Sequence, residues 1–200
     1  SLKFTGSTIT ITGRVAPGAE LTEEVSVAKP AAYTAEQFRS ALTAAGLAIG
    51  ATGTGTADPE RHWLLLEHSS APLGDLIVPL MKRSDNFFAE QVRWTLLSLY
   101  STEKPLETRY AALLNDFLNH SGMLDWGVTL VDGSGLSRQN AMSPAGLAKL
   151  LAYAATTVSY PALYGSLPIA GQDGTLKSRM CDTLACGNAR MKTGTMRGIS

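Results

Sequence analysis

Hydrophobic and polar residues alternate near the beginning of the chain. Between residues 7 and 15, threonine and isoleucine follow each other in turn, and this period of two predicts a half-buried β-strand. A weaker apolar segment at 21–28 predicts a second strand, and short apolar runs at 47–51 and 63–67 predict two more. The first third of the chain is therefore predicted to be rich in β-structure.

One helix is predicted within this region. Thr34 is followed three residues later by Gln37, a pair that forms a capping box at helix N-termini. Apolar residues then recur with helical spacing as far as Ala45, and Gly46 is of the residue type that most often follows a helix C-terminus. The pattern predicts a helix over 34–45.

Later in the chain the apolar spacing becomes that of α-helices. It predicts helices at 73–80, 87–99 and 106–120. Ser143 followed by Pro144 predicts the N-terminus of another helix, because serine caps helices and proline suits the first helical position. We expect the first of these helices to break near Pro79, and the second to bury Phe88, Val92, Leu96 and Leu99.

Two more segments, at 128–131 and 189–195, predict strands. The first leads into a glycine-rich turn at 132–135, and the second lies close to the end of the sequence. The chain is thus predicted to be an α/β protein of the α+β type. It is expected to be β-rich up to about residue 66 and mainly helical afterwards, with a strand at the end.

Composition and charge exclude several classes of protein. The chain has 200 residues, of which 44% are hydrophobic, so it can form a sizeable core. Its 17 basic and 17 acidic residues cancel to a net charge of zero, which argues against non-specific binding to nucleic acid. The apolar runs are all shorter than the roughly 20 residues of a membrane helix.

Metal binding is not expected from the cysteine and histidine content. The chain has 2 cysteines and 3 scattered histidines, without CxxC or HExxH spacing. Cys181 and Cys186 are either two separate thiols or a small disulfide loop, and we favour the disulfide. A disulfide would indicate an oxidising compartment.

Ser84-Asp85-Asn86 lies between two predicted helices. In such a turn the first and third side chains can project to one side. The Ser84 hydroxyl could then pass a proton to a leaving amine, and the Asn86 amide could both donate to and accept from a substrate amide. Taken alone, the three residues are more often a plain helix N-cap.

Lys192-Thr193-Gly194-Thr195 lies on the last predicted strand. An edge strand can align a peptide antiparallel to itself, and Gly194 would let a substrate backbone approach closely. Thr193 and Thr195 share one face of the strand and could bind a substrate carboxylate, and the Thr195 N–H could stabilise an oxyanion. Lys192 would add positive charge. Taken alone, the string is more often an exposed lysine before an ordinary turn.

Together these strings carry a family resemblance. Three further segments contribute to it, namely Asp132-Gly133-Ser134-Gly135-Leu136-Ser137, 67–73 and 173–176. The chain resembles the D-alanyl-D-alanine carboxypeptidase/endopeptidase family, the class C low-molecular-mass penicillin-binding proteins. The resemblance covers roughly residues 24 to 200 and is most specific from Glu67 onward.

The resemblance implies a fold and a domain organisation. The fold is a β-lactamase/transpeptidase-like catalytic domain into which β-rich domains are inserted. Residues 1–66 would be the tail of the inserted domain, and 67–200 the second part of the catalytic domain, incomplete at its C-terminus. The change of pattern near residue 66 agrees with this division.

The resemblance also implies the reaction and the roles of single residues. It implies an acyl-serine peptidase that acts on D-Ala-D-Ala ends of peptidoglycan stem peptides, binds β-lactam antibiotics, and works in the periplasm or outside the cell. No metal or organic cofactor is expected. Ser84 would be the proton shuttle, Asn86 the substrate-amide binder and Lys192 the electrostatic partner. The substrate carboxylate and oxyanion would be bound by Thr193, Gly194 and Thr195.

The nucleophile that the family carries in a helical Ser-x-x-Lys is not found in the sequence. Two strings have this spacing, at 26–29 and 101–104, but proline follows the lysine in both, so neither is expected to be helical. We therefore expect the chain to be a fragment that is inactive alone and has the remainder of its own protein as a partner.

Two other functions remain open at this point. A serine β-lactamase would need a deacylating glutamate between the two motifs, in a loop beyond the helix that follows Ser84-Asp85-Asn86. The last glutamate before Lys192 is Glu107, at or near the start of a helix, which argues for slow deacylation. The other alternative is a non-catalytic peptidoglycan-binding module that retains half of a site.

Overall fold

A computed structural model gives the fold of the chain. It describes residues 2–5, 8–20, 22, 25–56, 58, 60, 63, 66–100, 105–196 and 198. The chain divides into two compact units, Ser1–Glu67 and His68–Ser200, and each is described by itself.

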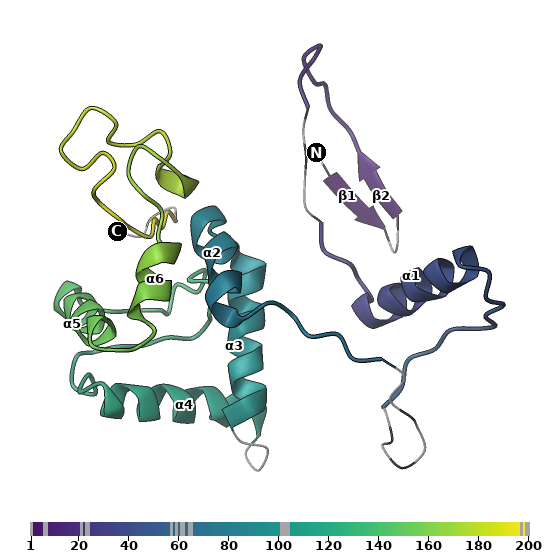
Figure 1. Cartoon of the computed structure of the whole chain (residues 1–200), viewed down its shortest axis with the longest axis horizontal. Helices are drawn as coiled ribbons and strands as arrows, with labels where there is room; N and C mark the ends of the chain where they lie inside the picture. The colour runs from purple at the N-terminus through teal and green to yellow at the C-terminus, as the bar shows by residue number, and fades with distance from the viewer. Residues whose placement is uncertain are drawn as a thin grey trace. The chain divides into compact units, whose positions relative to one another are not determined.

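The described residues of the first unit form one hairpin and one helix (Figure 1). Strand β1 (Leu2–Thr5) pairs antiparallel with β2 (Thr8–Ile11), with Leu2 opposite Ile11. The strand predicted at 7–15 is confirmed over 8–11 and wrong over 12–15, where the backbone has no partner strand.

Helix α1 (Pro30–Ala44) begins four residues before the predicted start. Proline is favoured at the first helical position because its fixed φ suits the helix and its missing N–H is not needed there. Thr34 consequently lies inside the helix and is not its cap. The predicted end is confirmed, since Gly46 has a left-handed φ of +89° directly after the last turn.

The other strands predicted in this unit are not formed where the structure describes them. Residues 25–28 and 47–51 have no strand pairing. In the strand predicted at 63–67, residues 64 and 65 lie outside the described residues, and 63, 66 and 67 have no strand pairing. An apolar run becomes a strand only when a neighbour accepts its backbone hydrogen bonds, and the described residues provide none here.

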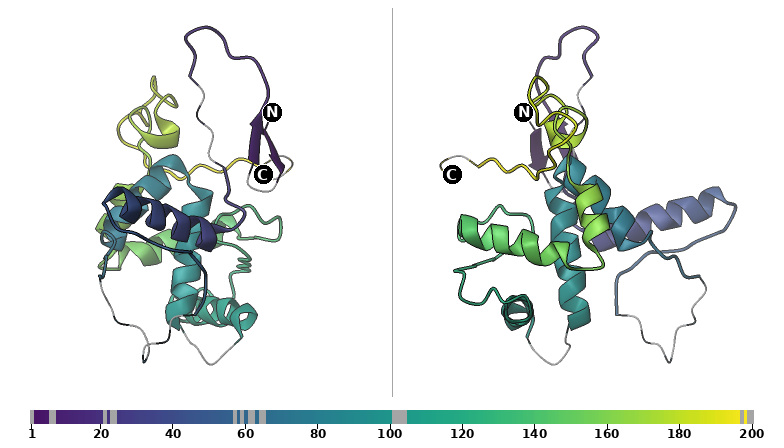
Figure 2. Two further views of the ribbon diagram at one scale, coloured as in Figure 1. Left: turned by 90° about the vertical axis from the view of Figure 1, so that its right-hand side faces the viewer. Right: turned by 60° about the vertical axis from the view of Figure 1, so that its left-hand side comes forward.

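The second unit is mainly helical. Its helices are α2 (Leu73–Arg83), α3 (Asn86–Tyr100), α4 (Leu106–His120), α5 (Pro144–Ala155) and α6 (Tyr160–Ser166), followed by a short 3₁₀ helix, η1 (Gly174–Leu176). Helix α2 packs against α6, η1 and α3, and α3 packs against α4. The additional views in Figure 2 show α2 beside α3 from other sides.

Proline 79 does not break α2, contrary to the prediction. It lies inside the helix, which continues to Arg83. The proline removes one backbone hydrogen bond, but the packing of α2 against three neighbouring helices stabilises the helix across that position.

The buried hydrophobic side chains of this unit lie in two places. On α3 and around the end of α4, Leu97, Leu118 and Met123 have exposed fractions of 1%, 4% and 0%. At and before η1, Ala170 and Leu176 are exposed by 0% and 1%. The predicted apolar face of α3 is displaced, because Leu96 and Leu99 are exposed by 46% and 78%. The face that packs on α4 is therefore the one that carries Leu97.

The two predicted strands of the second unit are reduced to isolated bridges. Thr129 pairs with Ala141, and Arg190 pairs with Ile169. Residues 191–195 have no ladder partner among the described residues. The α+β prediction is thus only partly met, since the described part of this unit is helical with almost no sheet.

Cys181 and Cys186 are both free and exposed, so the favoured disulfide is not formed in this structure. The Cys181 thiol faces the carbonyl oxygen of Lys177 at 3.9 Å. The Cys186 sulfur instead occupies space beside Gly171, only 2.5 Å from where a β-carbon on that glycine would stand. The Cα of Cys181 is also near this position, at 3.5 Å, so both cysteines lie beside Gly171 although they are not bridged.

No helix in the described part of the chain is long and apolar enough to cross a membrane.

Candidate active site

Ser84 ends α2 in an unusual backbone conformation. Its φ of 57° and ψ of 51° are left-handed, a region that non-glycine residues rarely adopt. Strain of this kind costs on the order of 1–3 kcal/mol and tends to occur at functional sites. The turn is closed by Asp85, whose N–H donates to the Leu80 carbonyl oxygen at 3.1 Å.

Asp85 is the N-cap of α3. Its Oδ1 accepts from the Phe88 N–H at 2.8 Å, and its carbonyl oxygen accepts from the Ala89 N–H at 3.1 Å. The capping function that the sequence suggested for all three residues is thus performed by the middle one. Ser84 and Asn86, on either side, are left to line a cleft.

Lys192 reaches across this cleft to Ser84. Its Nζ donates to Ser84 Oγ at 2.6 Å and to the carbonyl oxygen of Thr193 at 2.6 Å. An ammonium group can only donate, so Ser84 Oγ is the acceptor and its own proton is available to another group. Burial lowers the pKa of the Lys192 ammonium, although much of the side chain is exposed.

The cleft has a volume of about 690 Å³. Its walls come from the end of α2, the turn between α2 and α3, the loop at 133–137 and the segment 192–196. All six residues predicted for the site line it: Ser84, Asn86, Lys192, Thr193, Gly194 and Thr195.

The segment 193–195 is open toward the cleft at its centre. A β-carbon on Gly194 would meet no atom within 4 Å, so nothing crowds that backbone. Thr193 Oγ1 lies 2.8 Å from Thr175 Oγ1. Each hydroxyl can donate or accept, and the Thr193 proton is free for a ligand only when Thr175 is the donor.

An ion pair joins α2 to the residues just before η1, which lie beside the segment 193–195. Lys82 Nζ lies 2.7 Å from Asp173 Oδ2 and donates to the Leu167 carbonyl oxygen at 2.7 Å. The hydrogen bond from Lys82, followed by one from the Ile169 N–H, holds the pKa of Asp173 below its usual value. Gly174, with a φ of +55°, packs so tightly that a β-carbon would stand 2.8 Å from the Lys82 carbonyl oxygen.

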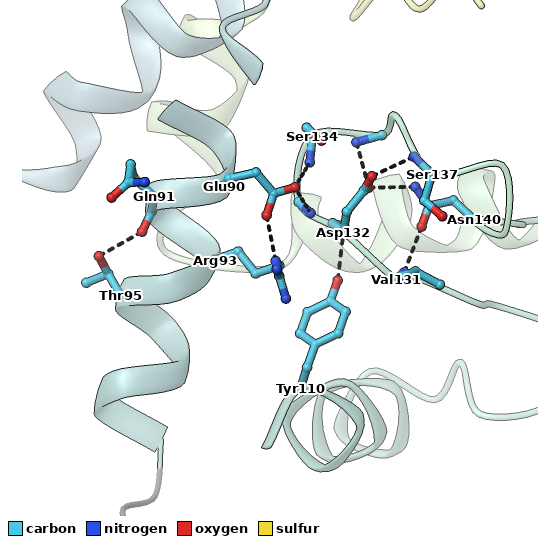
Figure 3. A network of polar contacts seen from close by, with 12 residues as sticks. Glu90, Gln91, Arg93, Thr95, Tyr110, Val131, Asp132, Ser134, Ser137 and Asn140 are labelled. Carbon is cyan, nitrogen blue, oxygen red and sulfur yellow. Dashed lines mark hydrogen bonds and ion pairs between the residues drawn. The ribbon is translucent and has the colours of Figure 1, made fainter. Parts of the chain in front are cut away.

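Asp132, to which the sequence assigned no role, organises the opposite wall (Figure 3). Its carboxylate accepts from the N–H groups of Gly135 at 2.8 Å and Ser137 at 2.6 Å, and from Asn140 Nδ2 at 2.7 Å. Burial acts to raise the pKa of Asp132, but these hydrogen bonds outweigh it and the pKa is lowered. Asp132 therefore stays ionised and shapes the loop without lining the cleft.

The Ser-x-x-Lys string at 26–29 is not helical, as expected, because Lys29 is the residue before α1. The string at 101–104 lies outside the described residues. Among those described, no group of three histidine, cysteine or acidic side chains could hold a metal ion.

Comparison with families and curated proteins adds independent findings. The model of the D-Ala-D-Ala carboxypeptidase 3 (S13) family matches residues 1–200. The chain is 35% identical, over 97% of its length, to a D-alanyl-D-alanine carboxypeptidase from Actinomadura sp. (strain R39), and 31% identical over 84% to the D-alanyl-D-alanine carboxypeptidase DacB of Haemophilus influenzae. It spans only 38% and 36% of those two relatives.

A solved structure is similar as well. The crystal structure of penicillin binding protein 4 (dacB) from Haemophilus influenzae, complexed with a novel β-lactam, matches with a TM-score of 0.75 at 29% identity. The match covers 87% of this chain and 41% of that one. The chain therefore shares the penicillin-binding protein fold over most of its length.

Proposed function

This chain belongs to the D-Ala-D-Ala carboxypeptidase 3 (S13) family, and we propose that the full-length protein carrying it, the parent protein, is a serine D-Ala-D-Ala carboxypeptidase/endopeptidase. It would cleave peptidoglycan stem peptides through an acyl-enzyme and bind β-lactams. The observation that carries the proposal is the 2.6 Å contact between Lys192 Nζ and Ser84 Oγ.

The proposed reaction begins outside this chain. A serine of the parent protein attacks the carbonyl carbon between the two D-alanines, and the C–N bond breaks as the acyl-enzyme forms. The leaving D-alanine needs a proton on its nitrogen, and Ser84 is proposed to supply it. Because Ser84 Oγ accepts from Lys192, its own hydrogen is free to move to that amine. Ser84 would regain a proton from the Lys192 ammonium along their hydrogen bond. The proton that the attacking hydroxyl loses would return to the lysine, so that one proton is passed in all from the attacking oxygen to the leaving nitrogen.

The other cleft residues are proposed to bind the substrate. Asn86 is exposed on the cleft and offers a donor and an acceptor to the substrate amide. Thr193 and Thr195 would bind the terminal carboxylate and the oxyanion, with Lys192 supplying positive charge. The uncrowded backbone at Gly194 leaves room for the substrate main chain.

The acidic residues of the cleft support a penicillin target over a β-lactamase. The described lining of the cleft contains one carboxylate, that of Asp85, and its Oδ1 already accepts the Phe88 N–H. We propose that Asp85, held as the cap of α3, does not act as a general base for deacylation, so the penicilloyl enzyme would persist. Steady hydrolysis of penicillin by the parent protein would contradict this.

The same family membership supports proposals on organisation and location. Residues 1–66 are proposed to be the tail of a β-rich inserted domain, and 67–200 part of the catalytic domain. The parent protein is proposed to act in the periplasm or outside the cell, where peptidoglycan is found. The chain alone would be inactive because its nucleophile lies elsewhere in the parent protein.

The test is covalent labelling of the parent protein with a fluorescent penicillin. We expect the unmodified protein to be labelled and Lys192→Ala to be labelled much more slowly. Lys149→Ala is the matched control, because Lys149 is exposed on α5 and does not line the cleft. A parent protein that is not labelled, or a Lys192→Ala variant labelled at the unmodified rate, would refute the proposal.

A further inference from the structure

Glu90 connects α3 to the cleft wall formed by residues 133–137 (Figure 3). Its Oε1 accepts from two backbone N–H groups, those of Gly133 at 2.8 Å and Ser134 at 2.9 Å. Its Oε2 accepts from Arg93 Nε at 2.8 Å. One carboxylate thus holds two consecutive amides of the loop and is itself held by a cation on the same helix.

The position of Glu90 on α3 relates this contact to the site. It follows Asn86 by four residues, which places both near one face of the helix. Asn86 and the 133–137 loop both line the cleft, and Glu90 is the side chain that joins the helix of the first to the backbone of the second.

The loop also approaches α3 too closely for a side chain. A β-carbon on Gly133 would stand 2.9 Å from the Ala89 carbonyl oxygen and 3.0 Å from Arg93 Cβ. The glycine therefore permits the approach, and the Glu90 carboxylate uses it to reach both amides.

The loop at 133–137 is also held by hydrogen bonds that do not involve Glu90. The Asp132 carboxylate binds the N–H groups of Gly135 and Ser137, as described above. The Tyr110 hydroxyl donates to the Asp132 carbonyl oxygen at 3.2 Å. The Arg93 guanidinium lies over the Tyr110 ring at 4.9 Å. Asp132 therefore sets the form of the loop, whereas Glu90 and Arg93 set its place relative to α3.

We infer that Glu90 is a positioning residue of the cleft, which holds the 133–137 wall at a fixed distance from Ser84 and Asn86. The expected effect of Glu90 on acylation rests on the proposed function. The position that Glu90 gives to the loop does not. Glu90 does not itself line the cleft, so its effect is exerted through the loop.

The ionisation of Glu90 is consistent with this role. Burial alone would raise its pKa, but the hydrogen bonds from Arg93, Ser134 and Gly133 outweigh burial, so the pKa is lowered. The carboxylate is therefore charged at neutral pH, and hydrogen bonds to a charged acceptor are shorter and stronger than neutral ones.

The kinetic test compares Glu90→Ala, Glu90→Gln and Gln91→Ala in the parent protein. We expect Glu90→Ala to slow acylation by penicillin roughly tenfold to a hundredfold, the order that about 1 Å of misplacement costs. Glu90→Gln keeps one oxygen for the two amides and should recover part of the rate. Gln91→Ala changes the next side chain on α3, whose position does not line the cleft, and should match the unmodified protein.

The fraction of Glu90→Ala molecules that penicillin labels shows whether the variant reacts slowly because its cleft is misplaced or because part of the protein is unfolded. A purely structural role would reduce that fraction while the remaining molecules react at the normal rate. We expect the reverse for Glu90→Ala, namely full labelling at a lower rate. Normal rates in the labelled molecules would overturn the inference.

Amide hydrogen exchange tests the geometry without any catalysis. The Gly133 and Ser134 amides should exchange slowly in the unmodified parent protein and in Gln91→Ala, and faster in Glu90→Ala. Equal exchange in Glu90→Ala and Gln91→Ala would overturn the inference, whether or not penicillin labels the protein. A parent protein that is not labelled but shows this exchange difference would refute the proposed function and leave the positioning of the loop established.

Discussion

Lys192 Nζ lies 2.6 Å from Ser84 Oγ, although 108 residues separate the two along the chain. This contact joins the turn between α2 and α3 to the segment near the C-terminus and defines the cleft between them. Its chemistry follows from the number of donors on each group. The lysine can only donate, so the serine keeps its proton for another partner.

The alkaline limb of penicillin acylation is expected to depend on Lys192. Burial lowers the pKa of Lys192 below the usual 10.5, so the ammonium loses its proton at a lower pH than an exposed lysine. Acylation by a penicillin, which carries a carboxylate, should therefore fall as pH rises through this lowered pKa. The pH profile of the acylation rate measures it.

Lys192→Arg provides the control for that profile, because arginine stays charged throughout the accessible pH range. Its acylation rate should be lower at neutral pH, since the guanidinium has a different shape, but its alkaline limb should disappear. An identical alkaline limb in both proteins would show that another group titrates.

The strained backbone at Ser84 predicts a difference in stability between two variants that lose the same hydroxyl. Ser84→Gly should be more stable than Ser84→Ala by about 1 kcal/mol, because glycine adopts a φ of 57° without the β-carbon penalty. Both variants lack the hydroxyl and should be acylated slowly. Denaturant unfolding and penicillin labelling measure the two effects. A Ser84→Gly variant no more stable than Ser84→Ala would contradict the strain.

The close packing of Gly174 predicts a destabilising substitution. Gly174→Ala should lower the free energy of unfolding by about 1–3 kcal/mol, because the residue has φ of +55° and the new β-carbon would stand 2.8 Å from the Lys82 carbonyl oxygen. Gly165→Ala is the matched control, since a β-carbon there meets nothing within 4 Å. Equal unfolding midpoints for the two variants would show that the approach is not tight.

The ion pair between Lys82 and Asp173 predicts a small, pH-dependent contribution to stability. The Asp173 side chain is 41% exposed, so Asp173→Asn should cost about 1 kcal/mol or less. The pKa of Asp173 is lowered, chiefly by the hydrogen bond from Lys82, so the contribution is present above the usual 3.8 and is lost as pH falls through the lowered pKa.

A double-mutant cycle checks that this contribution belongs to the pair. In a Lys82→Met background, Asp173→Asn should change the unfolding free energy less than in the unmodified protein. An unchanged cost in that background would assign the effect to the other partner of Asp173, the Ile169 N–H.

The helices that sequence could predict are those with local signals. The bounds of α4 were predicted at 106–120 and observed there. The start of α5 was predicted from Ser143, whose Oγ accepts the Gly146 N–H at 3.0 Å. Capping and helical spacing are properties of residues a few positions apart, so they can be read directly.

The strands could not be predicted in the same way. The pattern at 189–195 is typical of a strand, but a strand requires a neighbour that is distant in sequence. In the described part of the chain that neighbour is reduced to the bridge between Ile169 and Arg190. The residues of the segment alone do not reveal how much pairing is available.

Only the two motifs of the site could be predicted from the sequence. They are at 84–86 and 192–195, and the side chains that hold their surroundings in place could not be predicted. Glu90 reaches the Gly133 amide across 43 residues, and Lys82 reaches Asp173 across 91. Contacts of such long range leave no local pattern, so the structure was required to identify them.

The two hydrogen bonds of Lys192 have a consequence for inhibitor chemistry. An ammonium group carries three N–H bonds, and the described contacts with Ser84 and Thr193 use two of them. A small molecule with a carboxylate can therefore gain a bond to the third N–H without displacing either existing one, whereas its uncharged amide analogue gains a weaker one. The difference in dissociation constant between such a matched pair of compounds would measure what the hydrogen bond to the third N–H of Lys192 contributes.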